Sequence, residues 1–136
     1  MSEIKVDNLT GKTTAGDITV TSEGGAATQS LQQGLAKVWW NLNGTGTIAG
    51  RDSLNVSSYD DIGTGTYDSN YTNAMANADY SFQGTTGVNS NTAYVFAYHS
   101  YQAPSTTDIR FACETQSNIT LQDQAYIFGT LNGDLA

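Results

Sequence analysis

The sequence predicts an all-β protein, more specifically an antiparallel β-sandwich of jelly-roll type preceded by an extended β segment. From Lys37 onward, apolar and polar residues alternate with the period of two that is typical of strands with one buried face. Glycine, asparagine, aspartate and serine separate the alternating runs, which recur roughly every 8 to 15 residues. No long run with helical periodicity intervenes. Such spacing is typical of sandwiches and barrels.

Two parts are expected, residues 1–36 and residues 37–136. The first part holds two short alternating runs, 4–6 and 17–21, whose few apolar residues cannot build a core. A short helical turn capped by Ser30 is expected near its end. Because this part lacks a core of its own, we expect it to pair with another chain or with a larger scaffold.

The second part opens with the clearest strand of the chain. Val38, Trp40 and Leu42 are expected to point to the core, and Trp39 and Asn41 away from it. The next run follows the same rule, with Leu54 and Val56 expected to point inward. In each later run, the large side chains share one face of a strand. These sets are Tyr67 and Tyr71; Tyr80 and Phe82; Tyr94, Phe96 and Tyr98; Ile109, Phe111 and Cys113; and Tyr126 and Phe128, which flank Ile127.

Several strands carry apolar residues on both faces. Trp39 opposes Trp40, and Val95 and Ala97 oppose the aromatic row that contains Phe96. A sheet with one solvated face would show polar residues there. Each aromatic side chain buried between subunits adds about 2 kcal/mol by area, before ordering costs. The pattern therefore favours self-association, and the alternative is a monomer with a large two-sheet core.

Composition and charge exclude some partners. Thirteen acidic against five basic residues give a net charge of −8, and the basic residues are scattered. Nucleic acids and anionic membrane surfaces are disfavoured, because binding them requires clustered lysine and arginine. No stretch has the length and apolarity of a membrane span, and the N-terminus has no apolar signal region, so we expect synthesis in a cytosol and no membrane insertion.

The sequence holds one cysteine and one histidine. Cys113 alone cannot form an intrachain disulfide, and we interpret it as a small buried hydrophobic residue rather than a reactive thiol. His99 alone excludes a multi-histidine metal site within one chain. Copies of His99 meeting on a threefold axis are the alternative to an ordinary strand histidine.

The acidic residues do not form a recognisable catalytic or metal motif. Asp60, Asp61 and Asp68 lack calcium-loop spacing, and we interpret them as turn caps rather than ligands. Asp108 and Glu114 flank an expected strand, which is weak support for glycosidase chemistry. The sequence therefore predicts no metal, no cofactor and no enzymatic activity.

Tyrosines near expected turns or on outward faces suggest a binding surface. A tyrosine ring can stack on the C–H face of a sugar while asparagine and aspartate bind its hydroxyls. The alternative is that these rings pack between subunits. The candidates for glycan or receptor binding are Tyr59, Tyr67, Tyr71, Tyr98 and Tyr101.

Residues 36–87 resemble a repeating module of tailed-bacteriophage fibre proteins, of the type found in marine and cyanobacterial phages. Residues 108–129 fit the closing hairpin of the same module, and residues 3–20 look like the short N-terminal segment of fibre-like virion proteins. The motifs that carry the central resemblance are Trp39-Trp40, Asn43 to Thr47, Arg51 to Ser58, Asp61 to Tyr67 and Met75 to Tyr80.

The resemblance implies a homotrimeric virion protein, on the tail or capsid surface. Residues 1–36 would attach to other virion proteins or intertwine, and residues 37–136 would face outward. The expected function is a short trimeric tail fibre or fibre tip that binds a host-surface glycan. The alternatives are a capsid decoration or head-fibre protein, a free carbohydrate-binding module and, with least support, a polysaccharide hydrolase. The residues expected between subunits are Ile4, Val6, Ile18, Val20, Leu31, Leu35, Trp39 and Val95.

Overall fold

In a computed structural model of the chain, the described residues are 3–12, 18–87, 94–98, 102–116 and 118–136. The chain divides into two compact units, Met1–Leu35 and Ala36–Ala136. Nearly all regular structure is β, and every strand pair is antiparallel. The all-β prediction is therefore confirmed. His99 and Tyr101 lie outside the described residues.

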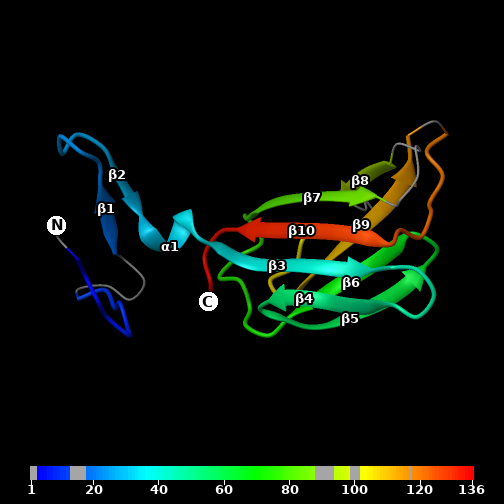
Figure 1. Cartoon of the computed structure of the whole chain (residues 1–136), viewed down its shortest axis with the longest axis horizontal. Coiled ribbons are helices and arrows are strands. Elements are labelled where there is room, and N and C mark those ends of the chain that lie inside the picture. Colours follow the sequence, from blue (N-terminus) through cyan, green and yellow to red (C-terminus); the bar gives the residue numbers. More distant parts are fainter. Residues whose placement is uncertain (1–2, 13–17, 88–93, 99–101, 117) are drawn as a thin grey trace. The chain divides into compact units, whose positions relative to one another are not determined.

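The first unit is a small hairpin followed by one helical turn (Figure 1). Strands β1 (Thr19–Thr21) and β2 (Thr28–Ser30) pair in antiparallel register. The turn α1 (Leu31–Gly34) is capped as predicted, because the Ser30 hydroxyl accepts a hydrogen bond of 3.5 Å from the Gln33 amide.

The second unit holds two four-stranded sheets, with orders β4-β3-β10-β7 and β5-β6-β9-β8. In Figure 1 the first sheet lies in front of the second. The bounds are β3 Ala36–Asn43, β4 Ala49–Leu54, β5 Val56–Gly63, β6 Thr66–Tyr71, β7 Ser81–Gly87, β8 Tyr94–Tyr98, β9 Asp108–Thr115 and β10 Tyr126–Asn132.

Strand β3 shows the alternation that the sequence predicts. Val38, Trp40 and Leu42 are buried, whereas Trp39 and Asn41 are only partly buried. The strand lies between β4 and β10, so both of its edges are paired within the sheet. The two adjacent tryptophans thus point to opposite faces of the sheet, and only Trp40 belongs to the core.

Aromatic rings from both sheets meet in one core. The Trp40 ring of β3 stacks on Phe111 of β9, with ring centroids 5.1 Å apart. Phe82 of β7 meets Phe96 of β8 edge-on, also at 5.1 Å. Such contacts add about 0.5–1.5 kcal/mol beyond area burial. One chain therefore builds this core from its own two sheets, and the side chains left outside it are those that a ligand or a partner would contact.

Two glycines make room for the largest core rings. A Cβ on Gly129 would lie 2.1 Å from the Trp40 ring, and a Cβ on Gly84 would lie 2.3 Å from the Phe96 ring. Gly129 of β10 and Gly84 of β7 lie directly opposite each other as cross-strand partners. The rings consequently lie against bare backbone, which brings the two sheets together at this point.

One inward assignment is wrong. Leu54 is 46% exposed and pairs with Trp39 on the outer face, whereas Val56 packs against the core as predicted. Between them Asn55 adopts a positive φ of 59°. This left-handed residue ends β4 and starts β5, so the alternation does not continue across it and the two residues lie in different sheets.

Candidate functional site

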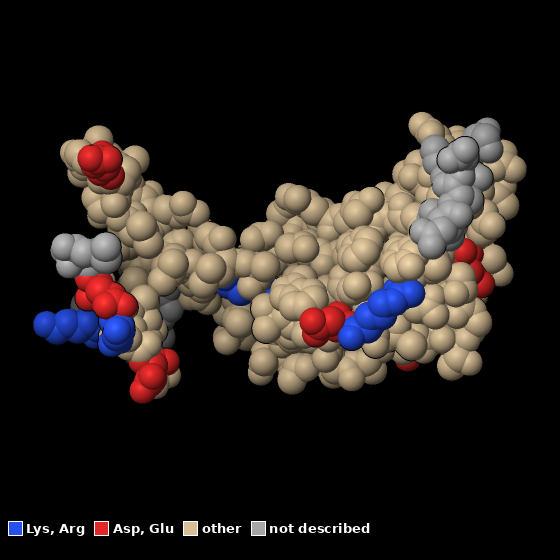
Figure 2. All heavy atoms as spheres, viewed as in Figure 1, with Lys and Arg blue, Asp and Glu red and all other residues tan. Residues whose placement is uncertain are grey.

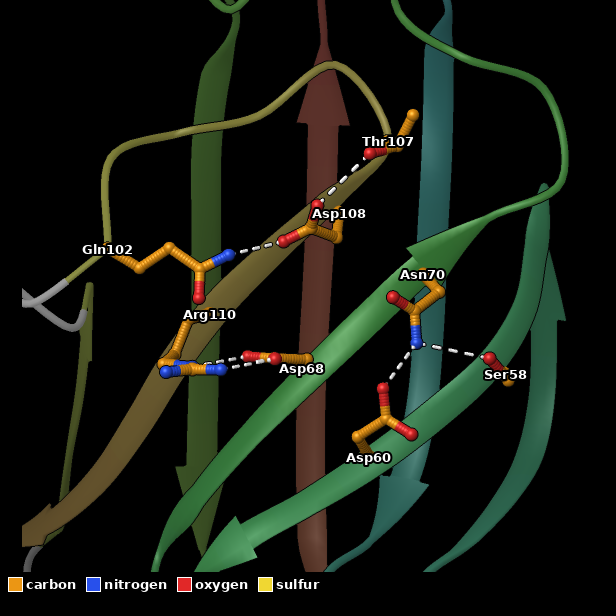
Figure 3. Close-up of polar contacts among 8 residues, drawn as sticks. All are labelled: Ser58, Asp60, Asp68, Asn70, Gln102, Thr107, Asp108 and Arg110. Atoms are coloured by element: carbon orange, nitrogen blue, oxygen red, sulfur yellow. Dashed lines mark hydrogen bonds and ion pairs between the residues drawn. The ribbon is translucent and has the colours of Figure 1, made fainter.

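The outer face of β5, β6 and β9 carries a cluster of polar side chains. In Figure 3 they lie on the near side of these strands, and β3 and β10 pass behind them. Asp68 and Arg110 are cross-strand partners, and the guanidinium donates from Nε and NH2 to the two carboxylate oxygens, each at 2.6 Å. This bond raises the pKa of Arg110 above its ordinary value. Asp68 is only 7% exposed, so its carboxylate is largely shielded from water, whereas the Arg110 side chain is 24% exposed.

The neighbouring carboxylates also have donors. The Asn70 amide donates to Asp60 at 2.8 Å and to the Ser58 hydroxyl at 3.1 Å. Asp108 accepts hydrogen bonds from Gln102 and from Thr107. Because the carboxylates bind side chains of adjacent strands and loops, the cluster holds this sheet together and is poorly placed for acid–base chemistry.

The acidic residues do not cap turns as predicted. Asp60 and Asp61 lie within β5, and Asp68 lies within β6. That interpretation is wrong because all three residues occupy paired strand positions, where Asp60 lies opposite Asp68 and Asp61 lies opposite Tyr67. Among the described residues, no group of three or more histidine, cysteine, aspartate or glutamate side chains is arranged to hold a metal ion.

The outer face of the other sheet is aromatic and mostly uncharged. Tyr126 and Phe128 of β10 are 38% and 40% exposed. The Arg51 guanidinium lies over the Tyr126 ring, 4.7 Å from its centroid, and its NH1 group donates to Asn41 Oδ1 at 3.3 Å. In Figure 2 the surface over β3, β10 and β7 shows almost no charged atoms.

A shallow hollow lies on this face between β7 and β10. Its volume is about 300 Å³. Phe128 stands beside Thr85, and Thr130 stands beside Gln83, as cross-strand pairs. We call it the β7–β10 hollow, and it is lined by Gln83, Gly84, Thr85, Phe128, Gly129 and Thr130. An apolar ring next to an amide and two hydroxyls suits a ligand with both an apolar and a hydroxylated side.

Two of the five tyrosines predicted to bind glycans are buried. Tyr67 is 0% exposed, and its hydroxyl lies 2.8 Å from Asp123 Oδ1 and 3.0 Å from the Gly44 carbonyl oxygen. Tyr71 is 8% exposed. Burial, with the hydrogen bonds to Asp123 and to Tyr80 respectively, raises the pKa of both phenols above their ordinary value. The binding role is wrong for these two, because both side chains face the core.

The other three candidates are Tyr59, Tyr98 and Tyr101. Tyr59 is partly buried, packs against the core and covers the backbone of Gly50. Burial raises the pKa of its phenol. Tyr98 is the last residue of β8, and Tyr101 lies outside the described residues. For these three, glycan binding stays a prediction.

The residues of the β7–β10 hollow were not predicted as a site from the sequence. A partial signal was present, because Tyr126 and Phe128 were placed together on one face of their strand, on either side of Ile127. Gln83 and Thr130 gave no such signal, since exposed glutamine and threonine occur throughout the chain. Only the strand register places these polar side chains beside Phe128.

The residues predicted to lie between subunits are accessible in the single chain. Three of them are partly buried, namely Ile18, Leu31 and Trp39. The others are exposed: Ile4 85%, Val6 59%, Val20 50%, Leu35 55% and Val95 40%. Such exposure is a requirement of an interface, and the assignment itself stays a prediction.

Cys113 agrees with its interpretation from the sequence. It is fully buried in β9, and burial raises the pKa of its thiol to about 11. Hardly any thiolate, the reactive form, is present at neutral pH.

Comparison of the chain with protein families, with curated proteins and with solved structures finds no significant match in any of the three. In the part of the chain that the structure describes, no helix is long and apolar enough to cross a membrane.

Proposed function

We propose that the chain is a bacteriophage virion protein, a short trimeric tail fibre or fibre tip that attaches to the host surface. Residues 36–136 would form a jelly-roll-like β-sandwich that faces outward, and the N-terminal unit would attach to the virion. The observation that carries the proposal is the exposure of large apolar side chains in that small unit: Ile4, Val6, Leu9, Val20 and Leu35 are each at least 50% exposed.

Exposed apolar side chains at this density call for a partner. Fully burying one such side chain contributes about 1.5–3 kcal/mol. The hairpin and the single helical turn of this unit leave them uncovered. Copies of the same segment around a threefold axis, together with a virion protein, would cover them. The resemblance of residues 36–87 to phage fibre modules supports the same assignment.

The first test is the mass of the full chain in dilute solution. Light scattering or sedimentation is expected to give three times the 14.5 kDa of one chain. A single folded species with the mass of one chain would contradict the trimer and remove the main physical support for the proposal.

The second test is carried out on phage particles. Particles that lack the protein are expected to adsorb poorly to host cells, and added purified protein is expected to compete with intact particles for adsorption. A reconstruction of intact particles locates the protein. Density on the capsid shell with normal adsorption of the deleted particles would favour a capsid decoration protein instead.

A carbohydrate-binding module is the second candidate, favoured by the β7–β10 hollow. A free module of this kind is expected to be monomeric and to bind sugar in the absence of any virion component. The mass measurement therefore separates the two functions.

A further inference from the structure

The β7–β10 hollow is a shallow, open depression lined by outward side chains of two paired strands. Phe128 and Thr85 form one outward cross-strand pair, and Thr130 and Gln83 form the next. Between the pairs, Gly129 and Gly84 direct their missing side chains toward the core, so bare backbone forms the floor. Its volume of about 300 Å³ is at the lower limit of ordinary ligand sites, which measure about 300–1,000 Å³.

We infer that this hollow binds an uncharged, hexose-like sugar unit. The C–H face of the sugar lies on the Phe128 ring, and its hydroxyls bind Gln83, Thr85 and Thr130. The inference rests on the proposed function only for the source of the sugar, a glycan of the host surface.

The hydrogen-bonding groups match a polyhydroxylated ligand. A glutamine amide offers two donors and an acceptor, and each threonine hydroxyl both donates and accepts. Gln83 and Thr85 are exposed and Thr130 is partly exposed, so their polar groups are accessible to a ligand. Phe128, 40% exposed, supplies the apolar surface next to them.

Charge favours a neutral ligand. The chain carries a net charge of −8, and the charged residues of the four strands of this sheet are Lys37, Arg51 and Asp52. None of these three lines the hollow. An anionic sugar would find no cation among the lining residues, because the Arg51 guanidinium lies over Tyr126, and it would be repelled by the acidic protein as a whole. A neutral sugar needs no cation and is not repelled by the negative charge of the protein.

The polar side chains of the hollow disfavour a second copy of the chain as the occupant. The approach of a flat protein face would remove Gln83, Thr85 and Thr130 from water. A polar group buried without a partner costs about 1–3 kcal/mol. The hydroxyls of a sugar can form hydrogen bonds with these groups, whereas a flat protein face would leave them without partners.

The test titrates the full-length, isotope-labelled protein with four methyl glycosides, those of glucose, galactose, mannose and N-acetylglucosamine, and with methyl glucuronide as the anionic counterpart. We expect saturable amide shifts centred on Gly84 and Gly129 for at least one neutral sugar. Phe128→Ala should weaken its binding by about tenfold or more, and Gln83→Ala should weaken it severalfold. Leu54→Ala, an exposed apolar change on the same face but outside the hollow, is the matched control and should leave binding unchanged.

Three results would overturn the inference. One is the absence of saturable shifts at the hollow with every neutral sugar. Another is tighter binding of the glucuronide than of the neutral sugars. The third is a fall of the solution mass to that of one chain in Phe128→Ala, which would make this face an interface between copies.

The inference and the proposed function can fail separately. A protein that is monomeric and binds sugar at the hollow contradicts the virion proposal and supports the sugar site. A trimer that is located on the particle, and whose amide signals shift with none of the neutral sugars, supports the virion proposal and contradicts the sugar site.

Discussion

At the scale of single residues, two glycines decide how closely the sheets approach. Gly129 and Gly84 lie directly beneath the Trp40 and Phe96 rings, at distances where no Cβ fits. Elsewhere in a strand, alanine in place of glycine often stabilises a protein, because it restricts the unfolded chain. A loss of stability on substitution of either glycine by alanine would therefore show that the aromatic ring lies against the backbone at that position.

Gly129→Ala is expected to lower the free energy of unfolding by about 2 kcal/mol or more, because the new methyl group displaces the Trp40 ring from its stack on Phe111. Gly87→Ala is the matched control, since a Cβ there has nothing within 4 Å. Urea unfolding measures both. A neutral or stabilising effect of Gly129→Ala would contradict the packing described for β10.

The buried phenols predict the alkaline behaviour. The pKa values of Tyr67 and Tyr71 are raised by burial, so the folded state keeps protons that the unfolded state releases above its pKa of about 10. The unfolded state then binds fewer protons, and each of these two phenols is expected to lower stability by about 1.4 kcal/mol per pH unit above that pKa. Urea unfolding at several alkaline pH values, with phenolate absorbance, measures this. Tyr67→Phe should reduce the slope by about 1.4 kcal/mol per pH unit, and an unchanged slope would contradict the burial of this phenol.

The sequence placed these residues on the correct shared face but assigned that face to the wrong surroundings. In the run from Thr66 to Tyr71, both faces carry polar atoms, and tyrosine suits either water or a core. Periodicity separates the two faces of a strand without saying which one is covered. In β3 the ambiguity did not arise, because Val38 and Leu42 mark the inner face.

At the scale of elements, the strands were predictable and their pairing was not. Alternation located most strands between Ala36 and Asn132, although it merged the end of β4 with the start of β5. Nothing in it shows that β3 lies between β4 and β10 or that β6 pairs with β9. The β7–β10 hollow depends on such pairing, since Phe128 and Gln83 are far apart in sequence. A site made across strands was therefore beyond what the spacing could predict.

The pairing of β6 with β9 predicts a measurable ion pair. A double-mutant cycle of Asp68→Asn and Arg110→Gln is expected to give a coupling of about 1–2 kcal/mol, because the contact is bidentate and Asp68 is largely shielded from water. The matched control is Glu3 with Lys5, whose side chains are 65% and 80% exposed and should couple by less than about 0.5 kcal/mol. Equal coupling in the two cycles would contradict a structural role for the pair.

At the scale of the whole molecule, the two units differ in how they are stabilised. Residues 36–136 enclose an aromatic core, whereas the described residues of the first unit leave their large apolar side chains in water. Exposed apolar side chains of this number add no stability to a solitary chain. The division of the chain therefore supports the proposed assembly through the N-terminal unit.

Assembly through the N-terminal unit predicts opposite outcomes for two neighbouring substitutions. Adjacent strand residues point to opposite faces, so Val20→Asp places a charge on the apolar face of β1 and Thr19→Asp places the same charge on the other face. Both variants gain the same net charge, which matches their general repulsion. We expect Val20→Asp to shift the solution mass toward that of one chain, with the near-ultraviolet circular dichroism of the second unit retained, and Thr19→Asp to stay trimeric. If Val20→Asp assembles as well as Thr19→Asp does, the apolar face of β1 does not hold the chains together.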